Sequence, residues 1–171
     1  LGLHKFFLDW QTDGTKDAVT GTALLILYAA RIFGETAKDS ACETTICSIN
    51  RKLQRFTSEE TSKKQIAAFQ VLCGQSSDGL ERLLEKDGAS GFSTFMAYFI
   101  LKALTVVGSS RTVDVIKEYY GGMTGRGATT FWEDFDVSWL DGSGRIDEIP
   151  APGKKDLHAD RSDERRVGKE C

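Results

Sequence analysis

Proline is absent from the first 149 residues of this 171-residue chain, and both prolines, Pro150 and Pro152, come near its end. Proline interrupts helix interiors and central strands alike, so its absence leaves room for long uninterrupted elements. Over the same region, apolar residues recur at spacings of three and four, which is the pattern of amphipathic helices. We therefore predict an all-α fold.

The apolar periodicity and the residues that favour helix ends divide this region into six predicted helices. Gly34 is expected to end the first, while Ser93 or Thr94 caps the fifth and Ser110 caps the sixth. The fifth is apolar almost all round and is expected to be buried. The predicted helices cover residues 19–34, 42–53, 57–74, 77–88, 95–108 and 109–122.

Short connections between these helices favour three antiparallel helical hairpins, since neighbouring helices joined by about two to eight residues pack side by side. In the third helix, acidic residues precede an apolar face formed by Ile66, Phe69 and Leu72. The pattern changes after the sixth helix, which we expect to end at a group of glycines. These are Gly121, Gly122, Gly125 and Gly127.

The segment that follows, GATTFWEDFDVSW at residues 127–139, combines acids with aromatic rings in a non-helical or edge-strand pattern. A solvated acidic face does not need two tryptophans, and a packed core does not accept three carboxylates. The combination predicts a partly dry pocket for a polar, weakly hydrophobic ligand such as a sugar ring. Its acids are Glu133, Asp134 and Asp136, and its rings are Phe131, Trp132, Phe135 and Trp139.

Charge and composition narrow the classes of partner. The net charge is −3 and no basic stripe follows the sequence, so nucleic acid is not an expected partner. No run approaches about eighteen apolar residues, and we expect no membrane span. Cys42, Cys47 and Cys73 lie in helical patterns at irregular spacing, which indicates neither a disulfide framework nor a metal site. No cofactor is expected.

The two ends of the chain do not read as native termini. Leu1 opens the sequence without a charged and then apolar signal segment, so we interpret this end as an internal cut, and the compartment is undetermined. The tail RSDERRVGKEC, residues 161–171, resembles a translated sequencing adapter with Asp163 in place of Glu. We predict that it is an artefact or a disordered tail.

Several segments together resemble the catalytic domain of bacterial α-L-rhamnosidases, which are glycoside hydrolases of family 78 with an (α/α)₆ six-hairpin barrel. In chain order these are FFLDWQT at residues 6–12, STFMAYFILKAL at 93–104, IKEYYGGM at 116–123, GATTFWEDFD at 127–136 and GRIDEIPAPGKKDLHAD at 144–160. The resemblance covers residues 1–160, and its most specific part is the Thr-Thr-aromatic-Trp-Glu motif. It implies about three hairpins of a partial barrel.

The resemblance implies inverting hydrolysis of terminal α-L-rhamnosyl linkages in a small molecule or polysaccharide. Inversion requires a carboxylic acid at the leaving oxygen and a carboxylate that activates water on the opposite face. The motif assigns the general base to Glu133. In the family, the general acid lies upstream in an Asp/Arg/Glu-rich loop that has no counterpart here, and a histidine-bearing part of the final hairpin is also missing. The chain is therefore expected to be an inactive fragment.

Five further residues are candidates for contact with the substrate. Asp9 and Trp10 resemble a substrate-binding position of the family. Trp132 either stacks on the sugar or packs in the core. Asp134 and Asp136 either bind sugar hydroxyls, raise the basicity of Glu133, or accept hydrogen bonds from loop amides.

Two other interpretations stay open. One is a six-hairpin glycosidase that acts on a different deoxy or uronic sugar. The other is a helical-repeat interaction module without chemistry, because stacked hairpins give a similar pattern. Such a module should show similarity between its repeats, and none is found across these hairpins. The oligomeric state is undetermined.

Overall fold

The computed structural model describes residues 15–37, 40–132 and 135–142, together with Leu8, Thr12 and residues 152–154. Every regular element within these residues is helical, which confirms the predicted all-α class. The predicted tail at residues 161–171 lies outside them. The helices are α1 (Thr15–Ala37), α2 (Ser40–Leu53), the 3₁₀ turn η1 (Gln54–Ser58), α3 (Lys64–Leu72), α4 (Asp78–Asp87), α5 (Thr94–Val106), α6 (Arg111–Gly125) and the 3₁₀ turn η2 (Val137–Leu140).

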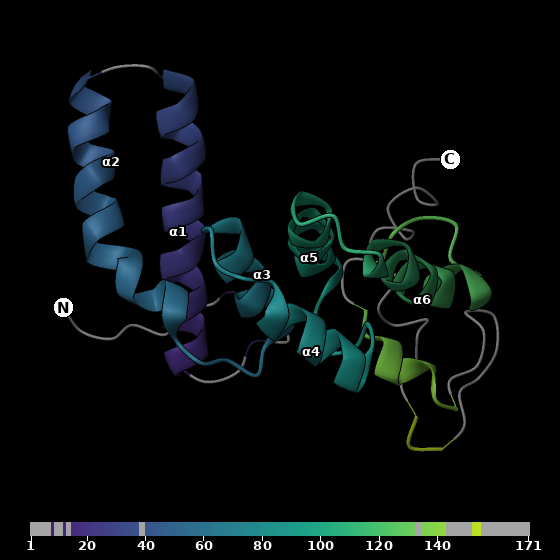
Figure 1. The fold of residues 1–171 in the computed structure, drawn as a ribbon. Helices are drawn as coiled ribbons and strands as arrows, with labels where there is room; N and C mark the ends of the chain where they lie inside the picture. The colour runs from purple at the N-terminus through teal and green to yellow at the C-terminus, as the bar shows by residue number, and fades with distance from the viewer. Residues whose placement is uncertain are drawn as a thin grey trace, which may run out of the picture.

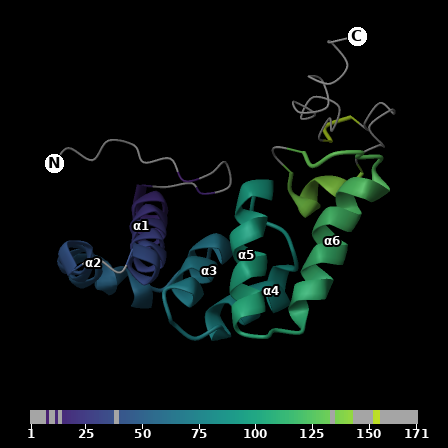
Figure 2. The ribbon, with the colours of Figure 1, turned by 90° about the horizontal axis from the view of Figure 1, so that it is seen from above.

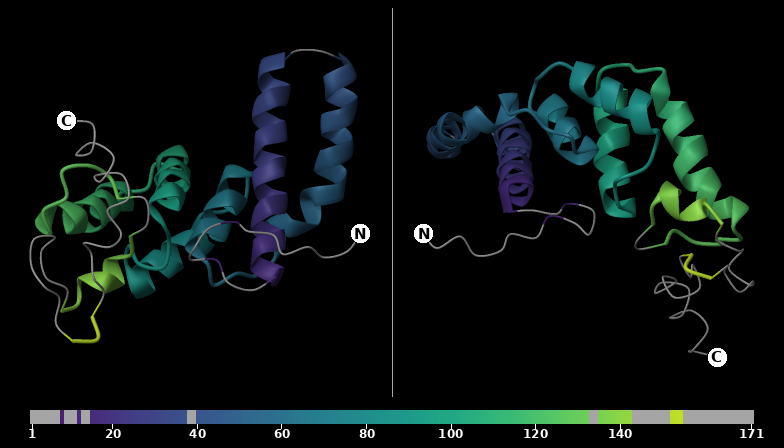
Figure 3. Two further views of the ribbon diagram at one scale, coloured as in Figure 1. Left: turned by 180° about the vertical axis from the view of Figure 1, so that it is seen from behind. Right: turned by 90° about the horizontal axis from the view of Figure 1, so that it is seen from below.

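The helices form an open row in which α2 packs on α1, α1 on α3, α3 on α5 and α5 on α6 (Figure 2). α4 packs against α3, and η2 packs against the end of α6. α1 and α2 form a long antiparallel hairpin that extends beyond the other helices (Figure 1), as the view from behind also shows (Figure 3). The hydrophobic core therefore runs along the row from α1 to α6.

α3 lies in the middle of this row. Its sequence predicts one apolar face, but the structure buries it on more than one side. Residues 64–69 are all buried, because α1 and α5 pack against opposite sides of α3. The helix is also shorter than predicted, since residues 54–58 form η1 and Glu59 and Glu60 lie in a connection. Gln70 holds that connection by donating from Nε2 to the carbonyl oxygens of Glu59 at 2.6 Å and Phe56 at 3.3 Å.

Gly34 does not end the first helix as predicted, and α6 ends at Gly125, within the predicted group of glycines, but later than Gly122. α1 continues through Gly34 to Ala37, and a Cβ at Gly34 would lie 2.8 Å from Ile46 Cδ1 of α2. α6 continues through Gly121 and Gly122 to Gly125. A Cβ at Gly122 would lie 2.7 Å from Leu140 Cδ1 and 3.3 Å from Phe135 Cζ. Glycine thus lets a second element approach each helix.

The helix caps agree with the predictions only in part. Ser93 caps α5 as predicted, because its hydroxyl accepts a hydrogen bond from the Met96 amide at 3.3 Å. At the start of α6, Ser110 makes no side-chain cap. The Ser109 hydroxyl accepts from the Arg111 amide at 3.2 Å instead, and it also donates to Glu81 of α4 at 2.5 Å.

α5 is not buried all round as predicted. Met96, Ala97, Ile100, Ala103 and Leu104 are buried, but the opposite face is open. That face exposes Phe95 and Tyr98 by 59% and 57%. No described helix covers this face, so part of the apolar surface of α5 is exposed to solvent.

α1 is the one described helix that is long and apolar enough to cross a membrane. Within Lys16–Ala37, an 18-residue window has a mean hydropathy of 1.3, and a third of that window is buried. Core helices of soluble proteins and signal sequences meet the same criterion. Leu24 and Leu27 of α1 are fully buried in the core. The absence of a membrane partner stays a prediction.

Candidate functional site

The aromatic-acid segment begins where α6 ends in a left-handed turn. The amide of Gly127 donates to Thr124 O at 3.0 Å, and the amide of Ala128 donates to Met123 O at 3.1 Å. This pair of bonds is the Schellman arrangement, with Gly127 in the left-handed conformation at φ +95°. An apolar contact between residues at the positions of Ala128 and Met123 commonly accompanies such a turn. The sequence after α6 is therefore set at a fixed angle to the helix.

Two large rings anchor the segment in the core on either side of the predicted base. Trp132 is 1% exposed and Phe135 is fully buried, and their ring centroids lie 5.4 Å apart. Phe135 also packs edge-on against Tyr119 of α6 at 5.1 Å. The backbone around Glu133 and Asp134 is thus bounded by a buried residue at each end. The two acids themselves lie outside the described residues.

Asp136, which follows Phe135, also fixes the segment, because its carboxylate accepts hydrogen bonds from backbone amides. It is 3% exposed, and its Oδ2 accepts from the Gly91 amide at 2.6 Å while Oδ1 accepts from the Ser138 amide at 2.8 Å. The second bond caps η2. The sequence leaves three roles open for Asp136. The structure shows one of them, in which the carboxylate accepts hydrogen bonds from loop amides. Contact with a sugar hydroxyl stays a prediction.

The loop between α4 and α5, residues 88–93, is held by charged side chains from three separate elements. Lys64 Nζ of α3 donates to Ser90 O at 2.9 Å, and Glu118 Oε2 of α6 accepts from the Ala89 amide at 3.0 Å. Asp136 adds the bond to Gly91. We call Lys64, Glu118 and Asp136 the loop clamp. It couples the aromatic-acid segment to α3 and α6 through one short loop.

The loop clamp places an ammonium group in a poorly solvated position. Lys64 is 5% exposed, and desolvation lowers the pKa of its ammonium group below the ordinary value. The carboxylates of Asp87, Asp136 and Glu118 act in the opposite direction, since negative charge favours the protonated form. Burial of this cation therefore depends on the carboxylates that surround the loop.

Tyr119 joins the same parts through its ring and its hydroxyl. The hydroxyl donates to Phe135 O at 2.7 Å, with Phe92 O at 3.2 Å, and the ring stacks on Phe92 with centroids 4.9 Å apart. At the outer edge, Arg126 Nη2 donates to Leu140 O at 2.7 Å. The sequence assigned no role to Tyr119, Lys64 or Glu118, although Glu118 and Tyr119 lie in the quoted segment IKEYYGGM. Each lies in an ordinary helical pattern, and only the fold brings it to the loop.

The remaining predicted site residues are placed in part. Asp9 and Trp10 lie outside the described residues, but their neighbours Leu8 and Thr12 do not. Leu8 is buried against α1, where a Cβ at Gly21 would overlap its side chain. Thr12 Oγ1 accepts from Gln65 Nε2 of α3 at 2.8 Å. Whether this segment meets the aromatic-acid segment stays a prediction.

The burial of Trp132 favours packing over a sugar platform in this conformation. Its Nε1 is buried, and none of the described residues accepts a hydrogen bond from it. A buried indole usually finds an acceptor, because leaving the donor unpaired costs about 1–3 kcal/mol. Stacking of Trp132 on a substrate stays a prediction.

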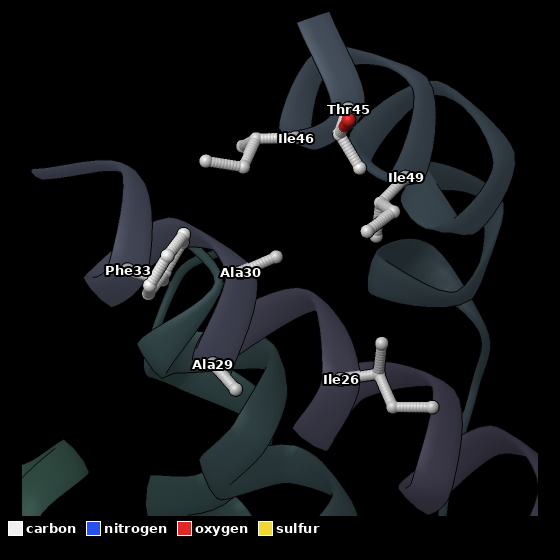
Figure 4. Close-up of a pocket in the computed structure, with 7 residues that line it drawn as sticks. All are labelled: Ile26, Ala29, Ala30, Phe33, Thr45, Ile46 and Ile49. Carbon is white, nitrogen blue, oxygen red and sulfur yellow. The ribbon is translucent and has the colours of Figure 1, made fainter. Parts of the chain in front are cut away.

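Two cavities lie on different parts of the molecule. One, of about 340 Å³, lies between α6 and residues 128–131 and adjoins the aromatic-acid segment. The other, of about 590 Å³, lies between α1 and α2 and is lined by Thr45 and apolar side chains (Figure 4). Among the described residues, no group of three or more metal-ligating side chains gathers at either place. The first cavity is the better candidate for a site.

Comparisons with protein-family models, with curated proteins and with solved structures found no match to this chain.

Proposed function

We propose that this chain is part of the catalytic domain of an inverting α-L-rhamnosidase, built as about three hairpins of an (α/α)₆ barrel, with Glu133 as the general base. The observation that supports this most is the pair of buried anchors, Trp132 and Phe135, on either side of Glu133 and Asp134. A catalytic base must be held in place to activate water at a fixed distance from the anomeric carbon.

The loop clamp supports the same proposal. Its three charged side chains all bond the backbone of the loop at residues 89–91, and Asp136 directly follows Phe135. Two of the three, Lys64 and Asp136, are buried, and charged groups are rarely buried unless they are paired or hydrogen-bonded. Preorganised sites need such supporting contacts around the reacting residue.

The test is Glu133→Gln in the uncut gene product that contains this chain, because the resemblance places the general acid upstream. With an aryl α-L-rhamnoside as substrate, kcat should fall about 10²–10⁴-fold while KM changes little, because the base acts on water. NMR of the first-formed product should show inverted anomeric configuration. In Glu133→Ala, added azide should give an inverted rhamnosyl azide. Glu133→Gln with most of its activity would disprove the assignment.

The same substrate panel separates the alternatives. An active protein that cleaves another aryl glycoside and not the rhamnoside would indicate a six-hairpin glycosidase for a different sugar. The helical-repeat module is the second candidate, because the helices contact one another in an open row, as stacked repeats do. No turnover of any aryl glycoside by the uncut gene product would favour that module.

A further inference from the structure

Gln65 is a polar side chain that the fold buries completely. It lies in the first turn of α3, where its exposed fraction is 0%. Its Nε2 donates to Thr12 Oγ1 at 2.8 Å, while its Oε1 is buried and accepts no hydrogen bond from any of the described residues. Burying an amide is unfavourable unless its hydrogen bonds compensate. Among the described residues, the bond to Thr12 is the side-chain contact that offsets this burial.

The segment of residues 8–12 is attached to helices at both of its ends. Leu8 is buried against α1, at the point where Gly21 has no room for a Cβ. Thr12, at the other end, is bonded to Gln65 of α3. Asp9 and Trp10 therefore lie, in chain order, between two residues that are fixed to different helices.

The same turn of α3 also reaches the loop clamp. Lys64, the neighbour of Gln65, donates from Nζ to Ser90 O at 2.9 Å, and the loop that contains Ser90 donates an amide to Asp136. Consecutive residues of one helical turn therefore bond the segment of residues 8–12 and the loop that holds the aromatic-acid segment. A rigid element that makes both contacts sets the separation of the parts that it holds.

We propose that Gln65 is a positioning residue, which acts through Thr12 to hold the segment of Asp9 and Trp10 at a set distance from the aromatic-acid segment. The proposal rests on the proposed function, because the family resemblance is what assigns substrate contact to Asp9 and Trp10. Gln65 is fully buried, so it acts on the substrate only through the segment that it fixes. Loss of its bond should displace that segment and weaken substrate binding.

The kinetic experiment uses Thr12→Val in the uncut gene product, since valine keeps the shape of threonine and lacks the acceptor oxygen. KM for an aryl α-L-rhamnoside should rise about 10-fold while kcat stays within about 3-fold, because Glu133 has its own anchors. Thr12→Ser keeps the hydroxyl and should leave KM within about 2-fold of the parent. Unchanged KM in active Thr12→Val would overturn the proposal.

A double-mutant cycle assigns the effect to one bond. Gln65→Met keeps the length of the side chain and should also raise KM about 10-fold, and the double variant with Thr12→Val should show the same increase rather than about 100-fold. Gln70→Met is the matched control, because Gln70 lies in the same helix and donates to Glu59 O and Phe56 O in another connection. It should leave KM within about 2-fold. An equal rise in KM in Gln70→Met, or additive effects in the cycle, would contradict the proposal.

A spectroscopic experiment on the 171-residue chain is independent of the proposed function. The tryptophans are replaced by 5-fluorotryptophan, and the loss of one ¹⁹F resonance in Trp10→Phe assigns the signal of Trp10. In Thr12→Val and in Gln65→Met this signal should shift toward its position in the urea-unfolded chain, whereas Thr12→Ser should leave it in place. Circular dichroism should show unchanged helix content in these variants.

The two experiments separate the two proposals. An unmoved Trp10 signal in folded Thr12→Val and Gln65→Met would overturn the role of Gln65, even in an active enzyme. A parent protein that does not cleave the rhamnoside would refute the proposed function, while a shifted Trp10 signal in the same variants would still support the contact between Gln65 and Thr12.

Discussion

The α1–α2 hairpin and the α3–α6 region are both helical, but they differ in what holds them. No described side chain of α2 is buried, and α2 contacts only α1 and η1 among the described elements. In α5, five side chains are buried, and the loop clamp and Tyr119 add polar bonds between elements. Apolar periodicity therefore predicts helices in both regions. How firmly each helix is packed depends on how many other elements contact it.

The hairpin also carries an apolar groove of about 590 Å³ between α1 and α2 near Phe33 and Ile46. The groove is open to solvent, since Ile26 and Phe33 that line it are 49% and 56% exposed. The two regions therefore differ in how closely their neighbouring elements cover their apolar side chains.

Hydrogen exchange should show the largest difference between the regions. Amides of α2 should exchange about 10³-fold faster than those of α5, because none of the described side chains of α2 is itself buried. The measurement is residue-resolved exchange of the 171-residue chain under native conditions, with α1 as an internal reference of intermediate protection. Equal protection in α2 and α5 would show that the hairpin is as firmly packed as the rest.

Removing one carboxylate from the loop clamp should cost the next largest amount. Asp136→Ala should lower the free energy of unfolding by about 2–4 kcal/mol, because it leaves the amides of Gly91 and Ser138 without their acceptor. Asp141→Ala is the control, since its exposed ion pair with Lys154 contributes less than about 1 kcal/mol. Urea unfolding measures both variants. An equal decrease in the free energy of unfolding would show that the loop clamp has no special structural role.

Three glycines give the smallest and most local test. Gly122→Ala should lower the free energy of unfolding by about 1 kcal/mol, since its new methyl group meets Leu140 and the Phe135 ring. Gly34→Ala should be close to neutral, because Ile46 can turn into the gap beside it. Thermal unfolding measures these two variants and the control variant Gly121→Ala.

The control is Gly121→Ala, which has no atom near its new methyl group and should gain about 0.5–1 kcal/mol from helix propensity. If Gly34→Ala cost as much as Gly122→Ala, the hairpin would be packed as tightly as the end of α6. The distinction between the two regions would then fail.

The sequence by itself determined the all-α class, the positions of most helices and the non-helical start of the aromatic-acid segment. Periodicity and capping are local properties, so Ser93 at the start of α5 could be predicted correctly. The Trp-Glu motif is likewise a short run of sequence, so it is recognised without knowledge of spatial contacts. The family resemblance at this motif made Glu133 the candidate base.

Only the tertiary structure decided which residues surround the candidate site. Gly34 and Gly122 read as helix ends because a sequence does not show what packs against them, and both lie inside helices that another element approaches closely. Lys64 reads as a surface charge in the sequence, but the fold buries it against the loop of residues 88–93, and Glu118 reaches the Ala89 amide of the same loop from the surface. These roles arise from contacts between residues far apart in the chain, which local patterns do not encode.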